Sequence, residues 1–144
     1  MSVALDTNVL LHGSDDGSPY RDRAIGLIDE IARGPQIVYL FWPTVMAYLR
    51  IATHPSIFSR PLPLAKARDN VKQLLALPNV QTASESGRFW PRLQEVLEDA
   101  APTGNLMPDA HVVALMLEHG VRTIWTRDRG FRRFRGIEVV DPLS

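Results

Sequence analysis

The hydrophobic positions of this chain follow two spacings, one typical of buried strands and one typical of amphipathic helices. Residues 37–42, IVYLFW, are continuously apolar and mostly β-branched or aromatic, as expected for a strand covered on both faces. Residues 22–33 instead carry apolar side chains at i, i+3, i+4 and i+7, the spacing of one helix face. Along the whole chain these patterns predict strands at 3–5, 37–42, 80–82, 123–126 and 137–140, and helices at 22–33, from Pro43 onward, at 67–75, at 93–100 and at 108–119.

The predicted order of elements, β-α-β-α-α-β-α-α-β-β, is typical of the α/β class. Strands separated by helices imply a mostly parallel sheet that is covered on both faces. The chain has 144 residues and no internal repeat or linker, so we expect one domain spanning residues 1–144. In such sheets, ligands bind beyond the carboxyl ends of the strands, which is where candidate chemistry is to be sought.

Composition narrows the possible classes of protein. No apolar run approaches the ~20 residues of a membrane span, and the N-terminal MSVALDTN has no basic region or long apolar core of a signal peptide. The chain has no cysteine, which excludes disulfides, thiolate catalysis and cysteine-based zinc sites. A cytoplasmic protein is the simplest expectation. The three tryptophans, Trp42, Trp90 and Trp125, lie on or beside apolar runs and are expected in the core.

Basic charge is local rather than global. The formal net charge is zero, so the whole chain has no general attraction to nucleic acid. The segment TRDRGFRRFRG nevertheless holds five of the arginines, at 127, 129, 132, 133 and 135. Such a stripe can bind phosphates, or it can be an ordinary solvated surface.

Two aspartates stand where the predicted fold places the carboxyl edge of the sheet, and a third joins them if the helix 108–119 begins near that same edge. Asp6 and Asp128 directly follow strands, and Asp109 opens the helix 108–119. Each has a structural explanation, since Asp is common at helix caps and in turns. Together, however, like charges repel one another unless a cation neutralises them. Carboxylate oxygens without nearby His or Cys favour Mg²⁺ or Mn²⁺, which could activate water against a phosphodiester.

Other chemistries lack their sequence features. No GxGxxG or GxxxxGK[ST] phosphate loop is present, and no GxSxG nucleophile elbow. A receiver-type phosphoacceptor needs a lysine after a late strand, but the only lysines, Lys66 and Lys72, fall in a predicted helix. Haloacid-dehalogenase-like phosphatases carry DxD after the first strand, where this chain has Asp6-Thr7-Asn8. The four histidines show no zinc spacing.

Several motifs together resemble one family. LDTNVLL, FWPTVMAYLRIATHPSIF, PDAHVVALMLEHG, TRDRGF and GIEVVDPL, in this order, are similar to motifs of PIN-domain ribonucleases, and more specifically of the VapC toxins of bacterial type II toxin–antitoxin systems. The resemblance spans essentially the whole chain. It implies a PIN-like three-layer sandwich with a mostly parallel five-stranded sheet. It also implies Mg²⁺- or Mn²⁺-dependent endoribonuclease activity, inhibition by a VapB-like antitoxin, and a homodimer.

The resemblance assigns roles to individual residues. It implies that Asp6, Asp109 and Asp128 are the catalytic, metal-binding carboxylates, supported by the polar side chains of Thr7, Asn8 and Thr126. Candidate contacts to RNA or antitoxin are Arg50, His54, Arg127, Arg129, Arg132 and Arg133. Arg50 suits a phosphate contact and an ion pair equally well. His54, which precedes a proline, is interpreted first as a turn residue.

One family acid is missing. The family places a Glu three residues before the arginine that matches Arg50, but residue 47 here is alanine. No Asp or Glu occurs anywhere between Glu30 and Asp69. The site could bind a metal with fewer ligands, water filling the gap. Another acid could substitute, with Glu98, Asp99 and Glu118 as candidates, or Ala47 could be an introduced inactivating substitution.

These alternatives lead to different functions. The first is a metal-dependent endoribonuclease whose hydrolysis leaves a 5′-phosphate and a 3′-hydroxyl. The second is a weakened or inactive PIN module that binds RNA or antitoxin without cutting. The third is a nuclease that acts on DNA.

Overall fold

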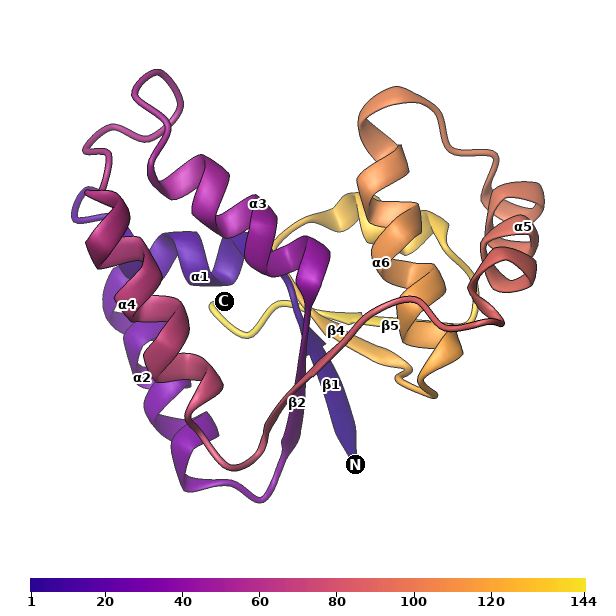
Figure 1. Ribbon diagram of the computed structural model, residues 1–144, viewed down its shortest axis with the longest axis horizontal. Helices are drawn as coiled ribbons and strands as arrows, with labels where there is room; N and C mark the ends of the chain where they lie inside the picture. The colour runs from indigo at the N-terminus through magenta and orange to yellow at the C-terminus, as the bar shows by residue number, and fades with distance from the viewer.

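Five parallel strands form the centre of the protein in a computed structural model that describes residues 1–144 (Figure 1). The strand order is β3-β2-β1-β4-β5, and every neighbouring pair is parallel. The strands are β1 (Ser2–Leu5), β2 (Ile37–Phe41), β3 (Val80–Ala83), β4 (Thr123–Trp125) and β5 (Glu138–Val140). The prediction of a mostly parallel five-stranded sheet is confirmed.

Helices cover both faces of this sheet, which confirms the predicted three-layer arrangement. Figure 1 shows α1, α2, α3 and α4 gathered to one side of the strands, and α5 and α6 to the other. The helices are α1 (Thr7–Ser14), α2 (Arg21–Arg33), α3 (Trp42–Ala52), α4 (Leu64–Leu75), α5 (Phe89–Ala100) and α6 (Met107–Glu118), with short 3₁₀ turns η1 (Gly104–Leu106) and η2 (Arg129–Arg133). No helix is long and apolar enough to cross a membrane.

Side-chain alternation along β1 builds a separate core on each face. Val3 and Leu5 pack into the cluster formed with α1 to α4, whereas Ala4 belongs to the cluster formed mainly by α6. Successive residues of a strand point to opposite faces, so this split is what a strand covered on both faces must show. Helix α6 buries Ala110 and the five consecutive residues 112–116. Its sequence is apolar on nearly all sides, as a buried helix requires.

The first helix is the element that sequence patterning did not predict. The segment TNVLLHGS forms α1 directly after β1, and its N-cap is Asp6. The Asp6 side chain accepts a hydrogen bond from the Thr7 backbone N–H at 2.8 Å. Pro43, by contrast, lies in the first turn of α3 as expected.

Successive strands are added on one side of β1 up to β3, and on its other side from β4 onward. The connections from β1 to β2 and from β2 to β3 run through α1 to α4, on one side, whereas the connection from β3 to β4 runs through α5 and α6 on the other. The adjacent strands β1 and β4 therefore diverge at a topological switch point, where open α/β sheets bind their ligands. Asp6 and Asp128 follow these two strands.

Two of the three tryptophans are not in the core. Trp42 is 43% exposed at the start of α3, and Trp90 is 60% exposed on α5, so the expectation for these two residues was wrong. Trp125 does pack against the core. An apolar run in the sequence does not tell which face of an amphipathic helix its large side chains occupy.

Candidate active site

A pocket of about 280 Å³ lies at the switch point, and the three aspartates line it together. Asp6 comes from the end of β1, Asp109 from the first turn of α6, and Asp128 from the segment after β4. Helix α3 supplies the opposite wall, with Ala47 and Arg50 among its lining residues. The structure thus brings together the three aspartates singled out by the sequence, and it puts Ala47 beside them.

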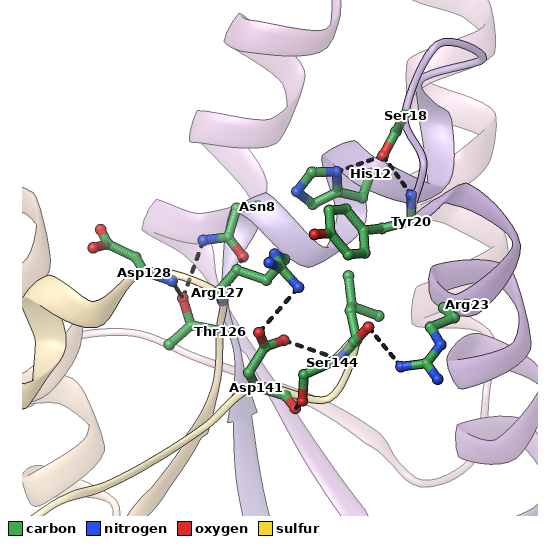
Figure 2. A network of polar contacts seen from close by, with 11 residues as sticks. Asn8, His12, Ser18, Tyr20, Arg23, Thr126, Arg127, Asp128, Asp141 and Ser144 are labelled. Carbon is green, nitrogen blue, oxygen red and sulfur yellow. Dashed lines mark hydrogen bonds and ion pairs between the residues drawn. The ribbon is translucent and has the colours of Figure 1, made fainter.

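The hydroxyl of Thr126 organises the centre of this site. Its side chain is 1% exposed, and its Oγ1 donates to Asp6 Oδ2 at 2.6 Å. The same oxygen accepts from the Asn8 side-chain amide at 3.1 Å and from the Asp128 backbone N–H at 2.9 Å (Figure 2). One buried hydroxyl therefore joins Asp6, Asn8 and Asp128, as the family resemblance implied for a supporting residue.

Thr7 and Asn8 attach this centre to its surroundings. Thr7 Oγ1 donates to the backbone carbonyl of Thr44 in α3 at 3.2 Å. Asn8 Oδ1 accepts from the Arg127 backbone N–H at 3.3 Å. The polar side chains after β1 thereby fasten the carboxyl ends of two strands and the start of α3 to one another.

Burial, with a smaller contribution from neighbouring carboxylates, raises the pKa of Asp6 and of Asp109. Burial raises the pKa of Asp6, although the hydrogen bonds from Thr126 and the Thr7 N–H oppose this effect. Burial, followed by the charges of Asp128 and Asp6, raises the pKa of Asp109 to about 7. None of the three aspartates forms an ion pair with Arg, Lys or His. The pocket is therefore an uncompensated negative site that a cation would stabilise.

The donor set fits a hard divalent cation that keeps part of its water shell. No three His, Cys, Asp or Glu side chains are close enough together to hold one ion directly. Mg²⁺ is nevertheless commonly bound through one or two carboxylates, with water completing its octahedron. The buried hydroxyl of Thr44, which also lines the pocket, has no hydrogen-bond partner. Oxygen donors without nearby Cys fit Mg²⁺ or Mn²⁺ better than Zn²⁺.

None of the proposed substitute acids reaches the pocket. Glu118 lies at the far end of α6, where its carboxylate bonds Ser86. Asp99 is 3.8 Å from the Arg135 guanidinium, and Glu98 lies beside it on α5. The pocket lining contains only the three aspartates as acids. The gap at Ala47 is therefore not filled by any of these residues.

Arg127 is engaged inside the protein. Figure 2 shows its side chain directed toward Tyr20 and Asp141, away from Asp128. Its guanidinium lies 3.8 Å from the centre of the Tyr20 ring, and Nη1 is 3.0 Å from Asp141 Oδ2. These contacts fix the C-terminal residues against the α1–α2 connection, where Arg23 also donates to the Leu143 carbonyl at 2.8 Å. The Arg127 side chain is thus not oriented for the contact to RNA or antitoxin that was predicted for it.

The other candidate contact residues lie in different positions. Arg50 lines the pocket, is exposed and makes no ion pair. Arg129, Arg132 and Arg133 are exposed on η2, next to Asp128 in the chain, and also form no ion pair. His54 Nδ1 accepts from the Ser56 backbone N–H at 3.0 Å, as a turn residue would. Of this group, only Arg50 shares the pocket with the aspartates.

Of the ionisable residues that line the pocket, His111 alone was not predicted from the sequence. Its Nε2 is 2.5 Å from Glu85 Oε1. Glu85 follows β3 and so stands at the same sheet edge as Asp6 and Asp128. The position of Glu85 after a predicted strand was the available signal.

Comparison with known proteins identifies similar chains. Residues 3–137 match the PIN domain family. The chain is 44% identical to Ribonuclease VapC48 of Mycobacterium tuberculosis over 144 residues, covering all of this chain and 99% of the relative. It resembles the solved structure of VapBC2 from Rickettsia felis bound to a DNA fragment from their promoter, with a TM-score of 0.70 at 12% identity, over 97% of this chain and 98% of the other. It also resembles VapC20 of Mycobacterium tuberculosis, a Sarcin-Ricin loop cleaving toxin, with a TM-score of 0.66 at 15% identity, over 94% and 98%. At these low identities, the two solved structures bear on the fold alone.

Proposed function

Because this chain belongs to the PIN-domain family, and within it to the VapC ribonucleases, we propose that it is the endoribonuclease toxin of a toxin–antitoxin pair, dependent on Mg²⁺ or Mn²⁺. The observation that carries the proposal is the pocket in which three aspartates without ion pairs meet Arg50. Carboxylates would hold a cation, and Arg50 would hold the phosphate that the cation attracts.

Asp6 and Asp109 would have different roles in hydrolysis. Thr126 and the Thr7 N–H hold both oxygens of Asp6 in place, so this carboxylate is oriented before any ligand binds. Asp109 has no such partners, and its pKa is raised to about 7, so a bound cation would favour loss of its proton and take the carboxylate as a ligand. Mg²⁺ or Mn²⁺, when bound, would lower the pKa of water and withdraw charge from the scissile phosphate. Water oxygen then attacks phosphorus, the P–O3′ bond breaks, and the products carry a 5′-phosphate and a 3′-hydroxyl.

A VapB-like antitoxin is proposed as the partner that restrains this activity. The support is family membership together with the solved Rickettsia felis neighbour, which is itself a VapBC complex. A homodimer stays a prediction from the family resemblance.

A binding module is the second candidate, and Ala47 is the observation that favours it. A glutamate at this position would add a fourth carboxylate to the pocket wall, and alanine cannot ligate a cation. If the fourth acid were indispensable, this chain would bind RNA or antitoxin without cutting.

Cleavage of RNA by the antitoxin-free chain separates the two candidates. We expect the chain as it stands to cut total RNA in Mn²⁺ and to stop in EDTA, because three aspartates suffice for a partly hydrated ion. The Ala47→Glu variant should cut at least as fast, and Asp6→Ala serves as the control for a contaminating nuclease. DNA of matched sequence tests the third hypothesis.

Cutting that persists in Asp6→Ala would refute the role assigned to the pocket. Activity in Ala47→Glu but none in the chain as it stands would establish the binding module. Equal cutting of DNA and RNA would show a nuclease without preference for ribose.

A further inference from the structure

A second groove, of about 480 Å³, adjoins the aspartate pocket. Phe89, Leu93 and Met107 give it an apolar wall, and Glu85 stands at its edge. Pro108 and His111 belong to both depressions, so the groove continues directly from the site proposed for the scissile phosphate. In an RNA chain the group adjacent to a phosphate is a nucleoside. If the scissile phosphate lies in the aspartate pocket, a ribose and its base would lie next to it, in this groove.

We propose that this groove is a nucleobase subsite, in which Glu85 selects a base that presents N–H donors, guanine foremost. The inference rests on the proposed function, because it takes RNA as the ligand of the neighbouring pocket. It adds a determinant of base preference that neither the three aspartates nor Arg50 provides.

The pair of Glu85 and His111 gives the groove its polar group. His111 Nε2 and Glu85 Oε1 are 2.5 Å apart, which fixes the carboxylate at the boundary between groove and pocket. The imidazole also packs edge-on against Phe89, with 5.4 Å between ring centres. The Glu85 side chain remains 43% exposed, and a carboxylate can accept several hydrogen bonds, so it keeps capacity for a ligand.

The loop that carries Glu85 is fastened to α6. Glu118 accepts from the Ser86 backbone N–H, with Oε2 3.2 Å from the nitrogen, and is also hydrogen-bonded to the Ser86 hydroxyl. His119 Nε2 donates to the Ser84 carbonyl at 3.0 Å. The residues on both sides of Glu85 are thus held by the end of the helix, so its position is set before a ligand arrives. Such preorganisation favours discrimination between ligands.

The chemistry of the groove fits a base and disfavours a phosphate. Apolar and aromatic side chains offer contact to the flat face of any base, and such stacking is tolerant of base identity. Glutamate accepts hydrogen bonds from amino groups of bases. The pairing edge of guanine presents two adjacent N–H donors, whereas that of uracil presents one N–H between two carbonyl oxygens that a carboxylate repels. No Arg or Lys lines the groove to attract a phosphate.

Binding of uncharged nucleosides tests the subsite without requiring cleavage. Guanosine and uridine are titrated separately into the full, metal-free chain, while the methionine methyl and histidine ring signals are followed by NMR. We expect guanosine to shift the signals of Met107 and His111 and to leave those of Met46 and His12 in place. Uridine should bind at least about ten-fold more weakly, the size of a lost hydrogen bond to a charged group.

Substitution of the acid tests the selection. Glu85→Gln should reduce the preference for guanosine over uridine to within about two-fold, because it removes the carboxylate but keeps the shape. Glu95→Gln, an exposed glutamate on α5 that pairs with Arg92, is the matched control and should keep the preference of the wild type. In the cleavage assay, RNAs that differ in one base beside the cut should show the same loss of preference in Glu85→Gln.

Different results would overturn the nucleobase subsite and the proposed function. Absence of shifts at Met107 and His111, equal binding of the two nucleosides, or an unchanged preference in Glu85→Gln overturns the subsite, even if the chain cuts RNA. Selective guanosine binding in a chain that does not cut RNA overturns the proposed function and leaves the subsite standing.

Discussion

Replacing Asp109 with asparagine should abolish RNA cleavage and, at the same time, stabilise the metal-free protein above pH 7. The loss of activity follows from removing a carboxylate that has no partner within the protein and is available to a cation. The gain in stability follows from removing a charge that burial, Asp128 and Asp6 all disfavour. A residue that serves only the fold would not combine these two effects.

The sign of the pH dependence comes from the raised pKa. In the folded protein the pKa of Asp109 is about 7, against an ordinary value of 3.8, so folding favours the protonated carboxyl. The free energy of unfolding of the wild type therefore falls as pH rises between these two values, and the loss is complete above pH 7. Because the group is only half-buried and screened by solvent, we expect the asparagine variant to be more stable by about 1–2 kcal/mol at pH 8.

Urea unfolding at pH 5 and pH 8, without metal, measures this difference. The advantage of Asp109→Asn should be larger at pH 8 than at pH 5. Mn²⁺ should raise the melting temperature of the wild type more than that of the variant. An asparagine variant that is less stable than the wild type at pH 8 would contradict the electrostatic description of the pocket.

Replacing Thr126 with valine should have the second large effect. The change keeps the shape of the side chain but removes the hydroxyl shared by Asp6, Asn8 and the Asp128 backbone N–H. We expect a loss of about 2–3 kcal/mol in the free energy of unfolding, because buried polar groups lose their partner. Losing this hydrogen bond also raises the pKa of Asp6 further, so cleavage near neutral pH should fall by about 100-fold or more.

Thr44 provides the matched control for this substitution. It is also 1% exposed and lines the same pocket, but its hydroxyl has no hydrogen-bond partner. Thr44→Val should therefore be neutral or stabilising in urea unfolding. Thr126→Ser, which keeps the hydroxyl, should recover most of the activity. Equal destabilisation by the two valine substitutions would mean that the hydroxyl of Thr126 has no special role.

Strand-forming and helix-forming patterns predicted most of the fold because both faces of the sheet are buried. The apolar run at 37–42 and the periodic residues at 22–33 correspond to β2 and α2 within one residue at each end. Helix α1 was missed because it has only eight residues and includes Gly13, although Asp6, its N-cap, had a possible capping role in the sequence. A cap and a ligand can be the same residue, since only one oxygen of Asp6 accepts from the Thr7 N–H.

One error about a side chain could have been avoided with elementary geometry. Glu118 lies nine residues beyond Asp109 on α6, which places it roughly 13 Å along the helix axis, too far to replace a ligand. Arg127, in contrast, lies in a bend between Thr126 and Asp128, and its guanidinium contacts Tyr20 and Asp141, which are distant in the sequence. The pair of Glu85 and His111 likewise depends on how the loop after β3 lies against α6. The sequence places Glu85 after a predicted strand, but it has no local signal for either of these tertiary contacts.

We expect the three aspartates to bind a divalent cation although residue 47 is alanine. Calorimetric titration of Mn²⁺ into the antitoxin-free chain, in two buffers of different ionisation enthalpy, measures both binding and proton release. We expect saturable binding in the chain as it stands. Proton release should grow as the pH is lowered from 8 to 6 and should shrink in Asp109→Asn, because Asp109 must lose its proton to the cation. Absence of saturable Mn²⁺ binding at millimolar concentration, or binding and proton release unchanged in Asp109→Asn, would contradict this expectation.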